Sequence, residues 1–154
     1  MYDASEATRR IERRIAAASA AHMSDAKWRK LFAALHSFPG RLRGAAIKFV
    51  NDDRMFVEPL PGPKFKHDDN LGECGGISYS RFAHIEFVQI PNRFASSPYG
   101  PRYPETVIEN DLSSLVDFLN KLGKFPIESC AEGIRVVGYS WKSDTHSREL
   151  GRHS

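Results

Sequence analysis

The sequence predicts a single α+β domain, with an antiparallel sheet of about five strands and two amphipathic helices packed on one face of it. A chain of 154 residues is long enough for one hydrophobic core and too short for two. Two segments carry apolar residues at helical spacing, and several short segments rich in β-branched and aromatic residues lie between turn-forming stretches. Alternating βα units are absent from the pattern, which argues against a doubly wound nucleotide-binding sheet.

Residues 5–21 are predicted to form a helix with Ser5 as its N-cap. Its apolar stripe is mostly alanine with Ile11 and Ile15, so we expect this helix to bury little surface. Met23 directly precedes a stronger helix start, and residues 1–22 are therefore interpreted as an N-terminal extension, followed by one domain over residues 23–142. The extension is either a segment upstream of the natural start or a helix used for dimerisation or docking.

Two stronger helices follow from apolar spacing and capping residues. Ser24 is the expected cap of the first, which carries apolar residues at i, i+3, i+4 and i+7 and ends before Pro39-Gly40. Asn110 or Asp111 is the expected cap of the other, and Gly123 stands where that helix should end. The two apolar stripes comprise Trp28, Leu31, Phe32 and Leu35 in the first helix, and Leu112, Leu115, Val116, Leu119 and Leu122 in the second.

Short strands account for the remaining apolar segments. Residues 45–49 and 55–57 are predicted to form a β-hairpin around Asn51-Asp52-Asp53. Residues 77–90 form a further predicted strand, with Ile85 and Phe87 on one face and His84, Glu86 and Val88 on the other. Two short strands are expected around Ala131-Glu132-Gly133, and the polar tail over residues 143–154 is expected to lack fixed structure.

Charge and composition exclude several classes of function. Residues 23–142 hold 16 Lys and Arg against 14 Asp and Glu, and Arg9, Arg10, Arg13 and Arg14 form a local cluster, so nucleic acid is not an expected partner. The sequence contains neither a long apolar run nor a secretory signal, which predicts a cytoplasmic protein with no membrane partner. Cys74 and Cys130 are interpreted as free thiols.

Candidate catalytic and metal-binding residues are sparse. His67, Asp68, Asp69, Cys74 and His84 are possible ligands, but their spacing matches no zinc motif, and neither a metal nor a cofactor is predicted. A nucleophilic arrangement of Cys74 with His84 and Glu86 leaves a small enzyme as an alternative. The glycines after Cys74 are better explained as a turn into the next strand.

Two long loops, residues 61–76 and 92–107, are rich in proline and glycine and are the best candidates for a function. Aromatic and arginine side chains are the usual anchors of protein interfaces, and acidic clusters attract basic partners. The predicted partner-binding residues are Asp68, Asp69 and Glu73 in the first loop, and Arg93, Tyr99, Arg102 and Tyr103 in the second. The alternative is that the aromatic side chains cover a sheet edge and the acidic ones keep the loop soluble.

Four segments carry a resemblance to a family of small, uncharacterised bacterial domains: KWRKLFAAL, IKFVNDDRMFVEPLP, GGISYSRFAHIEFVQIP and LGKFPIESCAEGIRVVGY. The resemblance covers roughly residues 24–140. These domains are similar in size and style to the immunity proteins of toxin systems, cytosolic partners that bind a toxin and block its active site. The resemblance implies a binding protein rather than an enzyme and carries no catalytic residues with it. The other alternative is a homo-oligomeric regulatory subunit assembled through the N-terminal helix.

Overall fold

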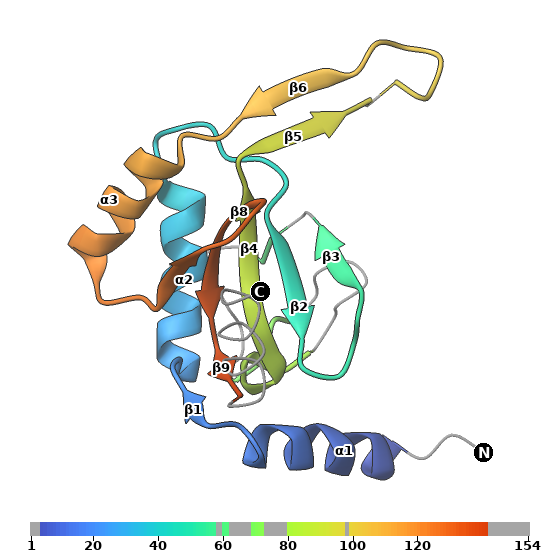
Figure 1. The fold of residues 1–154 in the computed structure, drawn as a ribbon, viewed down its shortest axis with the longest axis vertical. Coiled ribbons are helices and arrows are strands. Elements are labelled where there is room, and N and C mark those ends of the chain that lie inside the picture. The colour runs from blue at the N-terminus through green and yellow to red at the C-terminus, as the bar shows by residue number, and fades with distance from the viewer. Residues whose placement is uncertain (1–3, 58–59, 62–68, 73–79, 98, 142–154) are drawn as a thin grey trace, which may run out of the picture.

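The computed structural model of the protein describes residues 4–57, 60–61, 69–72, 80–97 and 99–141. Five strands form the central sheet in the order β3-β2-β4-β8-β7, and every neighbouring pair is antiparallel (Figure 1). The strands are β2 (Ala46–Phe49), β3 (Met55–Val57), β4 (Ile85–Pro91), β7 (Ile127–Ser129) and β8 (Gly133–Val137). The predicted α+β fold and the predicted hairpin formed by β2 and β3 are confirmed.

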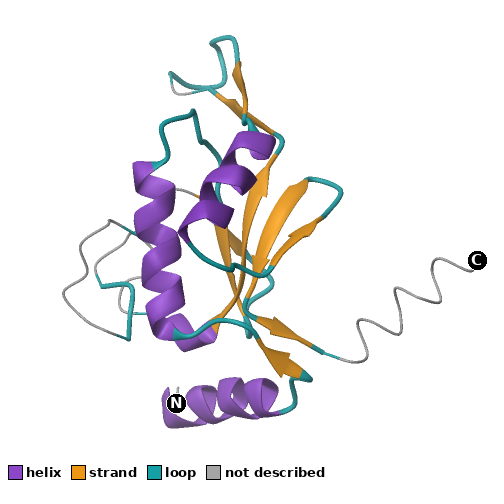
Figure 2. Cartoon of the chain, turned by 90° about the vertical axis from the view of Figure 1, so that its left-hand side faces the viewer, coloured by secondary structure: helices purple, strands orange, loops and turns teal. Residues whose placement is uncertain are grey.

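Helices α2 (Asp25–Ser37) and α3 (Leu112–Leu122) cover one face of this sheet (Figure 2). The Ser24 side chain accepts a hydrogen bond from the backbone N–H of Lys27 at 3.2 Å and caps α2. The helix ends at Ser37 because Phe38 precedes a proline, which disfavours helical backbone at that residue. Asp111 caps α3 through the N–H of Ser114. None of the described helices is both long enough and apolar enough to cross a membrane.

The hydrophobic core lies between these helices and the sheet. Trp28 and Phe32 of α2 stack with ring centroids 6.1 Å apart, and Phe32 stacks in turn on Phe82 at 6.2 Å. All three aromatic side chains are fully buried, so they exclude water from the centre of the domain. The sheet and α3 supply the aliphatic part of the core, which includes Ile47, Val88, Ile90, Leu115, Leu119 and Val136.

A β-bulge at the start of β4 changes which of its residues face the core. Phe49 pairs with Ile85 whereas Lys48 pairs with Phe87, so Glu86 is an extra residue on β4. Ile85 and Val88 therefore both enter the core, while Phe87 lies on the opposite face, beneath the guanidinium of Arg135 at 4.2 Å. The prediction that Ile85 and Phe87 share a face is wrong, because simple alternation does not allow for the bulge.

The N-terminal segment is attached to the C-terminal end of the sheet. Helix α1 (Ala4–Ala16) is followed by β1 (Ala20–Ala21), which pairs with β9 (Tyr139–Ser140). The indole N–H of Trp141 donates to the backbone oxygen of Arg14 at 3.0 Å, and the Arg14 guanidinium lies 4.0 Å from the centroid of the same ring. The predicted N-terminal helix is present, but it stops at Ala16 because the following residues pair with β9.

Residues 92–107 are not a simple loop as predicted. β5 (Arg93–Ser96) and β6 (Thr106–Glu109) form an antiparallel hairpin that projects from the end of β4 as an arm (Figure 1). The prolines and the glycine of this segment lie between residues 98 and 104, so turn chemistry is confined to the tip. The flanking residues pair as strands, with Phe94 opposite Ile108. Composition averaged over the whole segment concealed these strands.

Candidate protein-binding site

The base of the β5–β6 hairpin is held to the domain by Asn110. Its side-chain Oδ1 accepts from the backbone N–H of Arg43 at 2.9 Å, and its Nδ2 donates to the carbonyl oxygens of Arg43 and Pro91, each at 2.8 Å. The backbone N–H of Asn110 donates to the oxygen of Asn92 at 2.9 Å. One residue therefore joins the end of β4, the end of the hairpin and the loop before β2.

Phe94 provides the apolar contact at the same base. Its ring lies against Gly44, and the guanidinium of Arg43 is 5.2 Å from the ring centroid. A Cβ atom at residue 44 would overlap the Phe94 ring, and Gly44 has φ of 81°, a backbone conformation that favours glycine. The hairpin is thus anchored by packing as well as by hydrogen bonds, which restricts the directions in which it can move.

The tip of the hairpin is closed by its own hydrogen bonds. The backbone N–H of Gly100 donates to Ser97 O, and that of Tyr103 donates to Gly100 O, both at 3.1 Å. The Ser97 hydroxyl lies 2.5 Å from Gly100 O and 3.1 Å from Tyr103 O. Gly100 has φ of 108°, so the turn uses a conformation that other residues rarely adopt. The tip is therefore a hydrogen-bonded turn.

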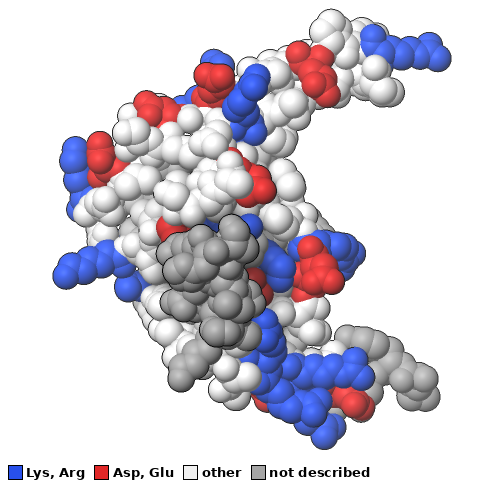
Figure 3. Space-filling model, viewed as in Figure 1, with Lys and Arg blue, Asp and Glu red and all other residues white. Residues whose placement is uncertain are grey.

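Two tyrosines are displayed at this tip. Tyr99 is 79% exposed and Tyr103 is 58% exposed, and their rings meet edge to face with centroids 5.9 Å apart. Val107 on β6 is also exposed, which places three of the five large exposed hydrophobic residues of the described structure on this hairpin. Figure 3 shows the hairpin as an arm, with a hollow in the molecular surface between the arm and the body. Exposed tyrosines at a rigid turn are suited to protein contacts because they bury much area at low entropic cost.

The charges of the hairpin are of both signs. Arg93 Nε lies 3.8 Å from Glu109 Oε1, and both side chains are largely exposed. Such a surface ion pair contributes little to stability. Arg102 is exposed beside the tyrosines. Three of the four predicted contact residues of the second loop, Tyr99, Arg102 and Tyr103, therefore lie at the tip of this hairpin, whereas Arg93 lies at its base.

Of the acidic residues predicted in the first loop, the structure describes Asp69. Asp68 and Glu73 lie outside the described residues. Asp69 accepts a hydrogen bond from Phe82 through its backbone oxygen, and its carboxylate lies 3.7 Å from Arg81. Phe82 precedes β4 whereas the hairpin follows it, so Asp69 and the hairpin are separated by the length of that strand, on the order of 20 Å at a rise of about 3.3 Å per residue.

Two members of the alternative nucleophilic arrangement, His84 and Glu86, are described by the structure. His84 belongs to the 3₁₀ turn η2 (Phe82–His84) and not to β4. Burial lowers the pKa of His84, and the charge of Arg81 lowers it further, while Glu12 opposes the shift. Glu86 pairs with Lys48 at 3.2 Å on the face of the sheet opposite α2 and α3. Cys74 and His67 lie outside the described residues.

The other sequence-derived candidates have ordinary surroundings. Cys130 is a half-buried free thiol whose Sγ lies 4.0 Å from Gln89 Oε1. Within the described ranges, no three His, Cys, Asp or Glu side chains are grouped in a way that would hold a metal ion. The predicted arginine cluster lies on α1, at the lower edge of the surface in Figure 3.

Sequence reasoning missed the residues that support the hairpin. The sequence predicts Asn110 only as a possible helix cap, and the roles of Arg43 and Gly44 depend on contacts with residues about 50 to 70 positions away. The available signal was local: Phe94 and Ile108 flank the proline-rich stretch symmetrically, as the strands of a hairpin do.

Comparisons of the chain with protein-family models, with curated proteins and with solved structures find no match.

Proposed function

We propose that the protein is a protein-binding module and that its contact element is the β5–β6 hairpin. Most concretely, it acts as a bacterial immunity protein that binds a cognate toxin and covers the toxin's active site. This specific role follows from the resemblance expected from the sequence over residues 24–140, and the comparisons with known proteins add no support to it. The general role rests on the hairpin alone, so the two levels of the proposal are tested separately.

The observation that carries the proposal is the exposure of Tyr99 and Tyr103 on a turn that is closed by its own hydrogen bonds. Two exposed tyrosines in edge-to-face contact give a partner an amphipathic surface that is already ordered. The Asn110 hydrogen bonds and the Phe94–Gly44 contact hold the arm in place before binding. Preorganisation of this kind reduces the entropy that association would otherwise cost.

Inhibition of an enzyme by a projecting arm has a direct physical basis. An active site is concave, and a narrow hairpin with an aromatic tip enters a concave surface that the flat face of a sheet cannot enter. Arg102 at the tip would pair with carboxylates of the partner. Asp68, Asp69 and Glu73 stay proposed contact residues because acidic side chains would attract a basic toxin.

Affinity capture from lysate of the source organism tests the general proposal. The tagged protein is expected to retain a stoichiometric partner, and a Tyr99→Ser/Tyr103→Ser double variant is expected to lose most of it. The matched control is Val57→Ser/Leu122→Ser, which removes two exposed apolar side chains outside the hairpin. Equal capture by both variants would remove the hairpin from the interface. The toxin role fails if the captured partner's activity is unchanged by the purified protein.

A further inference from the structure

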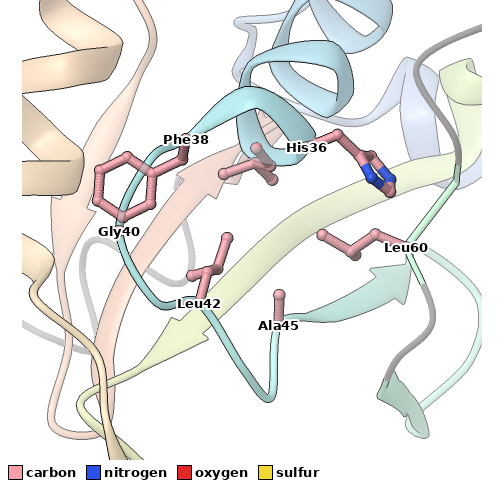
Figure 4. A pocket seen from close by; sticks show the side chains of 7 residues that line it. His36, Phe38, Gly40, Leu42, Ala45 and Leu60 are labelled. Carbon is pink, nitrogen blue, oxygen red and sulfur yellow. The ribbon is translucent and has the colours of Figure 1, made fainter.

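A second recess lies at the end of α2, close to the base of the hairpin. It has a volume of about 390 Å³ and is lined by Leu35, Phe38, Leu42, Ala45 and Leu60, with His36 as its one polar side chain (Figure 4). The Phe38 ring is held from behind by Phe118, with centroids 5.4 Å apart, and it lies directly over Gly40. The recess therefore combines apolar side chains with the imidazole of His36, the one polar side chain among the residues that line it, and such a combination can accept an aromatic ring that carries a polar group.

The chemistry of His36 defines what the occupant must carry. Its Nε2 is hydrogen-bonded to the carbonyl oxygen of Pro61. A carbonyl oxygen only accepts, so Nε2 is the donor in this contact, and the tautomer with its proton on Nε2 presents Nδ1 as an acceptor. Within the described residues, Nδ1 has no hydrogen-bond partner, and the side chain is exposed. An occupant with an N–H or O–H group satisfies this acceptor, whereas a purely hydrocarbon ring does not.

The recess and the hairpin share one loop. Leu42 and Ala45 line the recess, and the two residues between them, Arg43 and Gly44, hold Asn110 and Phe94 at the hairpin base. A protein that extends along the arm from its tip to its base reaches the loop that also lines the recess. This continuity favours a side chain of that protein as the occupant.

We propose that the recess at His36 receives a tryptophan or tyrosine side chain of the protein that binds the hairpin. This inference rests on the proposed function for the identity of the partner. The ring fills the apolar space between Phe38, Leu42 and Leu60, and its N–H or O–H donates to Nδ1 of His36. Interface anchors of this type are enriched in tryptophan and tyrosine, and they occupy pockets of the facing protein.

The test is an NMR titration of the full-length protein with N-acetyl-tryptophanamide, followed by backbone amide shifts. Saturable shifts at Leu42 and Ala45 are expected. N-acetyl-phenylalaninamide, which lacks a side-chain donor, is expected to bind about fivefold more weakly, the effect of one hydrogen bond of about 1 kcal/mol. His36→Phe is expected to abolish this preference while retaining the fold, because His36 is exposed.

Each other outcome overturns the inference. An absence of saturable shifts around the recess shows that it does not accept a ring. Equal binding of the two amides by the wild type removes His36 from recognition. Free indole binding tenfold or more tightly than the tryptophan amide identifies a free small molecule as the occupant instead of a side chain.

The experiments distinguish failure of the recess inference from failure of the hairpin proposal. The Tyr99→Ser/Tyr103→Ser variant has an intact recess and is expected to bind the tryptophan amide with wild-type affinity. If that variant still captures the partner, the hairpin proposal fails, and the inference fails with it because no hairpin-bound protein remains to supply the side chain. If the variant loses the partner but the wild type binds no ring, only the recess inference fails.

Discussion

Asn110 and Arg43, which are 67 positions apart in the sequence, form two hydrogen bonds: the Asn110 side-chain amide accepts from the backbone N–H of Arg43 at 2.9 Å and donates to its backbone oxygen at 2.8 Å. Because Asn110 also bonds to Pro91, this contact determines how the β5–β6 hairpin leaves the sheet. The hairpin and its tyrosines carry the proposed function, so the orientation set by Asn110 is part of that function.

Asn110→Ala is expected to lower the free energy of unfolding by about 1–3 kcal/mol, because the backbone groups of Arg43 and Pro91 lose their partner. Relative to the wild type, the variant should show a larger increase of amide hydrogen exchange in β5 and β6 than in β4. Asn120→Ala, at an exposed position of α3, is the matched control and should change stability by less than about 0.5 kcal/mol. Unchanged protection in the hairpin would show that Asn110 does not hold it.

Gly133→Ala is expected to destabilise the central sheet. A Cβ atom at residue 133 would overlap the backbone oxygen of Ile90 and approach Pro91 Cα to 2.9 Å, so the β4–β8 pairing must shift. Overpacking of this kind costs about 1–3 kcal/mol or more. Gly123→Ala is the control, since its nearest neighbour is the flexible end of the Lys30 side chain at 3.1 Å. Thermal unfolding should separate the two variants, and equal midpoints would contradict the packing described for Gly133.

Trp141→Phe is expected to loosen α1 while leaving the sheet intact. The substitution removes the indole N–H that donates to Arg14 O but retains an aromatic ring at a buried position. Loss of one such bond corresponds to about 1 kcal/mol. Hydrogen exchange in residues 9–16 should accelerate by up to about fivefold, with β2 and β4 as internal references. If exchange in α1 stays at the wild-type rate, another contact holds the helix.

The stability of the domain is expected to decrease as the pH falls below about 6.5, the ordinary pKa of histidine. Burial and Arg81 lower the pKa of His84 in the folded state, so the unfolded chain takes up a proton that the folded protein resists. The contribution of His84 to the free energy of unfolding is complete above pH 6.5. It is lost as the pH falls from 6.5 toward the lowered pKa of His84 in the folded state. In urea unfolding, the free energy of unfolding should change less between pH 7.5 and pH 5.5 for His84→Gln than for the wild type. An equal change in both proteins would show that groups other than His84 cause the pH dependence.

The helices and the sheet were predictable because their determinants are local. Ser24 as a cap, Pro39 as a stop and the spacing of Trp28, Leu31 and Leu35 are all visible within one segment, and the structure confirms them. The bulge at Glu86 was not predictable, since it becomes visible only when β4 is aligned against β2. The face occupied by Phe87 therefore follows from strand pairing and not from alternation.

The candidate site was predictable only in part. Tyr99, Arg102 and Tyr103 are predicted contact residues because of their residue types, and the structure places them at the tip of the β5–β6 hairpin. The strands beneath that tip were hidden by the nearby prolines. The recess at His36 was also missed, because its lining comes from the end of α2, the loop before β2 and Leu60, which meet only in the folded chain.

Site-specific photo-crosslinking at the hairpin tip tests the central claim most directly. Tyr99 is replaced with p-benzoyl-phenylalanine, the protein is irradiated in cells of its source organism, and adducts are identified by mass spectrometry. The same replacement at Leu122, an exposed residue of α3, is the control. The account predicts one dominant protein adduct from residue 99 and none from residue 122. No adduct at residue 99, or the same adducts from both positions, would contradict the assignment of the hairpin as the binding element.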